Sequence, residues 1–133
     1  MTSTIIFEGN IAAPPEMRTS PRGNVYAYVT VIVNYRKPDE DGVWHDVGKT
    51  SYAVTVFGAQ AQGLAYAAQS GNIRVRVEGD LTDRAYTNKQ GHDAVSHDVV
   101  AQYVTVSLSG QQVSVTKSAG AAVPDDDIVE DPE

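Results

Sequence analysis

Aromatic and basic side chains recur close together along this 133-residue chain. The groups that could act together are Tyr35 with Arg36 and Lys37, Tyr52 and Phe57 with Lys49, the pair Arg74 and Arg76, and Tyr86 with Arg84 and Lys89. Aromatic rings stack on unpaired nucleobases, and each stacked base contributes about 1–3 kcal/mol, while cations follow the backbone. Because every base has a π-face, such a set predicts binding of single-stranded nucleic acid without base preference, and refusal of duplex DNA.

Each of these residues also has an ordinary structural explanation. Phe57 precedes an expected helix and could equally belong to the core, whereas Tyr35 and Tyr52 could be common sheet-surface tyrosines. The two arginines that alternate within one strand could line a solvated edge. Tyr86 is the most informative position, because a tyrosine in a polar hairpin has little core to join.

The residues that could support catalysis are few. Histidine precedes aspartate three times, at His45-Asp46, His92-Asp93 and His97-Asp98. Neighbours on a strand point to opposite faces, so such pairs are poorly placed to share a proton or a metal ion. The chain has no cysteine and no phosphate-binding loop or nucleophile elbow. We therefore expect no enzyme, no metal site and no cofactor.

The elements that position these residues can be read from periodicity. Alternation of apolar residues predicts five strands, at residues 4–12, 25–35, 49–57, 73–82 and 97–108. Residues 59–69 contain five alanines and no β-branched residue, which favours a helix, and Gly71 ends it. A short helix between the third and fourth strands is typical of a five-stranded barrel of the oligonucleotide-binding (OB) type. The predicted fold class is thus all-β.

The connections are expected to be polar. Residues 13–24 contain two proline-bearing turns, residues 36–48 form a turn-like connection, and residues 83–96 form a long hairpin loop. Residues 111–116 alternate again, which indicates a possible sixth strand lying on a neighbouring subunit.

Charge divides the chain into two parts. The formal net charge is -7, with 10 basic and 17 acidic residues, but six of the acids lie within residues 125–133. Residues 1–124 therefore carry 10 basic and 11 acidic side chains, a net charge of -1. We expect one binding domain over residues 1–116, then a flexible linker and a disordered acidic tail over residues 117–133. No segment has the ~20 apolar residues that span a bilayer, so we expect a cytoplasmic protein.

Three motifs carry a family resemblance: GNIAAPPEMRTSPRGN at residues 9–24, VTVFGAQA at 54–61, and VEGDLTDRAY followed by NKQG over 77–91. In this order and spacing they resemble the bacterial single-stranded DNA-binding proteins of the small tetrameric OB type, over residues 4–108. The resemblance implies a homotetramer that binds single-stranded DNA in replication, recombination and repair, without cofactor or catalysis. It assigns base stacking to Tyr35, Tyr52, Phe57 and Tyr86, and a basic position to Arg84.

The end of the chain is similar to the family's acidic tip, which recruits replication and repair enzymes. The matching residues are Asp125, Asp126, Asp127 and Ile128, but no proline-phenylalanine end follows them. A sixth strand would resemble the clasp of actinobacterial relatives. The near-neutral body and the altered tip leave an alternative open, an OB-fold protein-interaction adaptor with weak DNA affinity.

Overall fold

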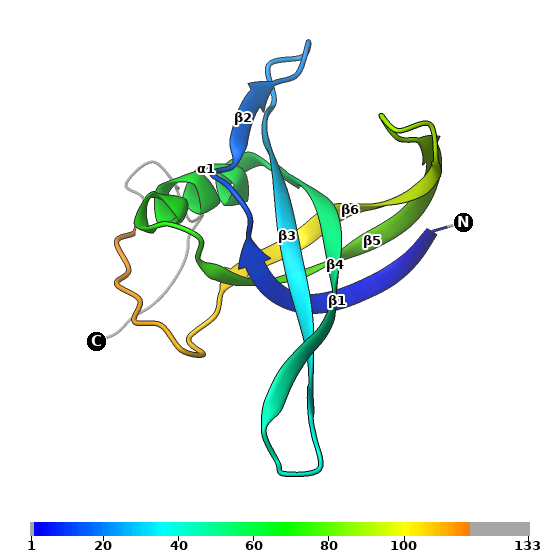
Figure 1. Ribbon diagram of the computed structural model, residues 1–133. Coiled ribbons are helices and arrows are strands. Elements are labelled where there is room, and N and C mark those ends of the chain that lie inside the picture. The colour runs from blue at the N-terminus through cyan, green and yellow to red at the C-terminus, as the bar shows by residue number, and fades with distance from the viewer. Residues whose placement is uncertain (1, 118–133) are drawn as a thin grey trace.

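The computed structural model describes residues 2–117 as a ring of five strands with a helix at one end (Figure 1). The ring runs β1-β5-β6-β4-β3 and closes where β3 pairs with β1; all its pairings are antiparallel except β4–β6. Its strands are β1 (Thr2–Ile11), β3 (Val25–Pro38), β4 (Trp44–Phe57), β5 (Arg74–Thr87) and β6 (Asp93–Val106). The predicted all-β OB barrel is confirmed.

The core lies inside the ring and consists of one face of each strand. Alternation decides which residues enter it, since β-branched side chains at every second position pack against one another. The fully buried aliphatic residues are Ile11, Val31, Val54, Val56, Val75, Val77 and Val99. The opposite face of each strand is therefore available for contacts outside the barrel.

The predicted helix is confirmed with a slight shift. Helix α1 (Gly58–Ala67) continues into a 3-10 turn, η1 (Ala68–Ser70), and ends at Gly71, which has a positive φ of 116°. It buries Ala61 and Leu64 against the end of the barrel. Within residues 2–117, no helix has both the length and the apolar character needed to cross a membrane.

Two hairpins extend beyond the barrel as long arms, and here the sequence-based boundaries were wrong. Residues 36–48 and 83–96 were expected to be polar connections, but most of them extend β3–β4 and β5–β6. Figure 1 shows the two arms leaving the barrel in different directions. Both faces of an arm are exposed, so the apolar alternation that identifies a strand is absent there.

The hairpins end in turns of one design. In the β5–β6 arm, the Asn88 side-chain oxygen accepts hydrogen bonds from the backbone N–H groups of Gln90 and His92, both at 3.0 Å. Gly91 then adopts a φ of 81°, which suits glycine best. Asp39 makes the same two bonds in the β3–β4 arm. Each turn fixes the pairing register of the strands it joins.

A short strand that was not predicted from the sequence pairs with β3. Strand β2 (Glu16–Thr19) pairs with residues 25–28 outside the ring, within what was expected to be a turn-rich connection. All four of its residues are exposed, so burial left no pattern to read.

The possible sixth strand at residues 111–116 is not formed in the single chain. Gln111 instead uses its side chain to accept from the Arg74 backbone N–H at 3.1 Å and to donate to the Arg74 carbonyl at 2.8 Å. These bonds tie Gln111 to the start of β5. Pairing with a neighbouring subunit stays a prediction.

Candidate nucleic-acid interface

One outer face of the barrel gathers aromatic side chains from three strands. Phe57 on β4 lies opposite Tyr26 on β3, with ring centroids 5.9 Å apart, and is 50% exposed. Tyr28, two residues along β3, pairs with Thr55. On β5, alternation from the partly buried Leu81 places the even-numbered positions 84 and 86 on the outer side. We name this set the aromatic face: Tyr26, Tyr28, Phe57, Arg84 and Tyr86.

Arg84 is held in place on this face by a carboxylate. Its Nε donates to Asp98 Oδ2 at 3.0 Å, and the Ser96 hydroxyl donates to Asp98 Oδ1 at 2.5 Å. The Asp98 bond raises the Arg84 pKa, and the nearby Tyr28 and Tyr86 add to this effect. The bonds from Ser96 and Arg84 lower the pKa of Asp98. A cation and an anion therefore both border the exposed rings.

Tyr35 and Tyr52 lie on the other side of the β3–β4 ribbon. Tyr52 alternates with the buried Val54 and stacks on Phe7 of β1, with ring centroids 4.2 Å apart. Burial raises its pKa. The Tyr35 hydroxyl is hydrogen-bonded to the Thr50 hydroxyl at 2.9 Å. The four predicted stacking residues are thus divided between two faces.

Tyr52→Ala is expected to lower the free energy of unfolding by about 3 kcal/mol, because it removes a partly buried aromatic ring from its stack on Phe7. Oligo-dT affinity of the folded variant should fall less than in Tyr86→Ala, whose ring is exposed. Urea unfolding and fluorescence anisotropy measure the two effects. A stable Tyr52→Ala variant with lost affinity would instead place Tyr52 in the binding surface.

The other predicted cations are distributed over the barrel and its arms. Arg74 donates to Glu8 at 2.5 Å and Arg36 pairs with Asp46 at 3.1 Å, so both are partly neutralised. The Arg74 and Ser107 bonds lower the pKa of Glu8. In residues 2–117, no ion pair engages Lys37, Lys49, Arg76 or Lys89.

The histidines do not pair with the aspartates next to them in sequence. His45 bonds to Asp39 and His97 to Asp83, both at 2.7 Å and each across its own hairpin. No cluster of three metal-ligating side chains occurs in the part of the chain that the structure describes. Each of these pairs bridges the two sides of its own arm.

Three further residues near this surface were not predicted from the sequence. Tyr26 and Tyr28 alternate with the buried Ala27 and Val29, so strand periodicity alone could have placed their rings outward. Arg18 lies opposite Tyr26 on β2. Its position depends on a strand that no sequence pattern indicated.

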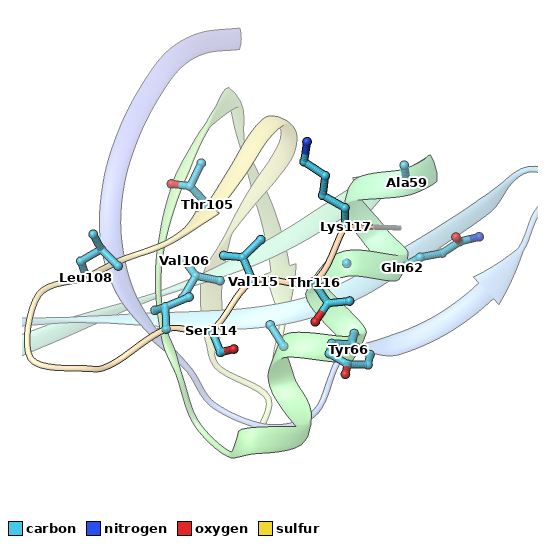
Figure 2. A pocket seen from close by; sticks show the side chains of 13 residues that line it. Ala59, Gln62, Tyr66, Thr105, Val106, Leu108, Ser114, Val115, Thr116 and Lys117 are labelled. Atoms are coloured by element: carbon cyan, nitrogen blue, oxygen red, sulfur yellow. The ribbon is translucent and has the colours of Figure 1, made fainter. Parts of the chain in front are cut away.

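A cavity of about 800 Å³ lies between α1 and residues 113–117, and none of its lining residues belongs to the aromatic face. Figure 2 shows Tyr66 of α1 on one side of it and Val115 on the segment that crosses beside the helix. Tyr66, Leu108 and Val115 are strongly exposed around it. Its lining is mainly apolar, which suits a hydrophobic contact better than a phosphate.

Known proteins resemble this chain in sequence. The profile of the Single-strand binding protein family matches residues 2–109. Single-stranded DNA-binding protein 2 of Streptomyces coelicolor is 29% identical over 119 residues, which are 89% of this chain and 59% of the relative. The Mycolicibacterium smegmatis single-stranded DNA-binding protein is 28% identical over 118 residues, 88% of this chain and 71% of the relative. The chain thus spans only about three fifths of the Streptomyces relative.

A solved structure also resembles this chain. A crystal structure of a small single-stranded DNA-binding protein from Streptomyces coelicolor superimposes with a TM-score of 0.67 at 23% identity. The match covers 80% of this chain and 94% of the other. At this identity the likeness concerns the fold.

Proposed function

Since the chain belongs to the single-strand binding protein family, we propose that it binds single-stranded DNA without regard to base sequence, in replication, recombination and repair. The observation that supports this most is the aromatic face, where exposed rings lie beside Arg84 on a rigid sheet. Unpaired bases can stack on such rings, whereas duplex bases cannot reach them.

In this proposal, the aromatic face and the arms have separate roles. Phe57 and Tyr86 stack on bases, while Arg84 and Lys49, which alternates to the same side of β4, contact phosphates. The path of the DNA extends beyond the aromatic face through the arm residue Tyr35 and the remaining predicted cations, which are Arg36, Lys37, Arg74, Arg76 and Lys89. Because several arginines already have carboxylate partners, few counterions are released, and affinity should decline only gently with salt.

An anisotropy titration tests the function directly. Labelled oligo-dT and a matched duplex are titrated with the protein at two salt concentrations. We expect strong preference for the single strand and a shallow salt dependence. Weak and equal binding to both would contradict the proposal and favour the protein-interaction adaptor.

Asp98→Asn is expected to tighten oligo-dT binding about two- to fivefold, because it removes a negative charge beside the bound phosphates and frees Arg84. The salt slope should become steeper by up to about 0.7, one more phosphate contact on a single strand. Asp93→Asn, an equal charge change on the other side of β6, is the control and should leave the slope unchanged. Weaker binding by Asp98→Asn would show that Asp98 is needed to position Arg84.

We also propose a cytoplasmic homotetramer without catalytic activity. The exposed apolar residues around the α1 cavity support self-association, since patches of this kind are commonly covered. Light scattering should give four times the 14.2 kDa mass of one chain. Recruitment of replication and repair proteins through Asp125, Asp126, Asp127 and Ile128 is proposed from the sequence alone, because these residues lie outside the described part of the chain.

A further inference from the structure

Two tyrosines on β3 present their rings outward at consecutive positions of the aromatic face. Tyr28 is 42% exposed and Tyr26 is half-buried, and between and beyond them Ala27 and Val29 are buried in the core. The buried neighbours fix the strand's orientation, so neither ring can turn inward without exposing core residues. The sheet therefore holds both rings in place before any ligand arrives.

Phe57 widens the platform that the rings of Tyr26 and Tyr28 form. Its ring lies directly across from Tyr26, 5.9 Å away between centroids and tilted by 43°. Same-face residues two apart on an antiparallel strand are about 6.8 Å from each other, whereas successive stacked bases of a DNA strand rise by about 3.4 Å. Consecutive bases can therefore each lie against one tyrosine when the single strand is extended to about twice its stacked rise.

Cations border the platform at both ends. Arg18 on β2 is the register partner of Tyr26 and also pairs with Glu16. Hydrogen bonding to Glu16, and further to the Tyr26 hydroxyl, raises the Arg18 pKa. At the other end, Arg84 lies near Tyr28. Aromatic rings between two guanidinium groups match a chain of bases joined by phosphates better than an apolar protein surface.

We propose that Tyr26, Tyr28 and Arg18 form a further subsite of the aromatic face, which stacks consecutive unpaired bases on the two tyrosines and contacts a phosphate through Arg18. This rests on the proposed function, because it extends the same DNA path across β3 to β2. The path then crosses the whole outer sheet, from Arg18 to Tyr86.

The stacking part is tested with Tyr28→Ala, Tyr28→Phe and the control Val95→Ala, an exposed apolar residue on the side of β6 opposite Asp98. Each variant is titrated with oligo-dT and with an abasic strand of the same length. We expect Tyr28→Ala to bind oligo-dT about five- to 150-fold more weakly, which corresponds to one stacked base. Tyr28→Phe and Val95→Ala should bind like the parent, and all variants should bind the abasic strand equally.

The phosphate part is tested with Arg18→Gln against Arg22→Gln, an exposed arginine in the neighbouring turn. Arg18→Gln should weaken binding of both strands and reduce the salt slope by about 0.7, whereas Arg22→Gln should not. An unchanged slope in Arg18→Gln would overturn this contact.

The outcomes separate this subsite from the function itself. If the parent does not bind oligo-dT, the proposed function fails. If the parent binds but Tyr28→Ala binds equally well, only the subsite fails. An equal loss on the abasic strand would also overturn stacking, and a change of oligomeric mass in Tyr28→Ala would show that a second copy covers this face. Circular dichroism confirms that each variant is folded.

Discussion

The double variant Phe57→Ala with Tyr86→Ala is expected to bind oligo-dT at least about thirtyfold more weakly than the parent. Each ring is about half exposed, so its loss removes a stacking surface and leaves the core intact. Two stacked bases contribute roughly 2–6 kcal/mol together, which sets the lower bound of the expected change. Fluorescence anisotropy at fixed salt measures the affinity.

Val43→Ala with Val95→Ala is the matched control for this variant. Both valines are at least as exposed as Phe57 and Tyr86, and neither belongs to the aromatic face. The control should keep parental affinity, and both double variants should keep the parental melting temperature. Equal affinity of the two double variants would contradict the assignment of this face.

Gly9→Ala is expected to lower the free energy of unfolding by about 3 kcal/mol or more. Gly9 lies where β1 meets β3 to close the ring, and an added Cβ would be 2.4 Å from the backbone carbonyl oxygen of Ile32. A backbone atom cannot move aside alone, so the two strands would have to separate. Urea unfolding followed by circular dichroism measures the loss.

Gly63→Ala provides the opposite result in the same assay. Gly63 lies inside α1 with ordinary helical backbone, and an added Cβ would meet nothing within 4 Å. Alanine there should raise the free energy of unfolding by about 0.5–1 kcal/mol. If the stability lost in Gly9→Ala were smaller than the stability gained in Gly63→Ala, the close contact at the β1–β3 closure would not explain why residue 9 is glycine.

The barrel could be predicted from the sequence because its strands have one buried face. Alternation around Val29 and Val54 located β3 and β4, and the alanine-rich run before Gly71 located α1. The arms and β2 could not be delimited in this way, since they have no buried face to produce alternation.

The candidate site was predictable in part for a related reason. Tyr86 could be selected as a candidate because an aromatic residue among polar neighbours has little core to pack into, and Arg84 lies beside it in the sequence. Tyr52 could not be assigned to its stack, because its partner Phe7 is 45 positions away and meets it only once the ring closes. Arg18 depended in the same way on the unrecognised strand β2.

The shared turn design has a consequence for how this protein can change during evolution. Asn88 with Gly91, and Asp39 with Gly42, each fix one register at the tip of an arm. One residue added to each strand of an arm would preserve the pairing but move every side chain beyond the insertion to the opposite face. Arms that keep their surface chemistry must therefore lengthen or shorten by four residues at a time, two in each strand, and lineages should differ in arm length by such steps.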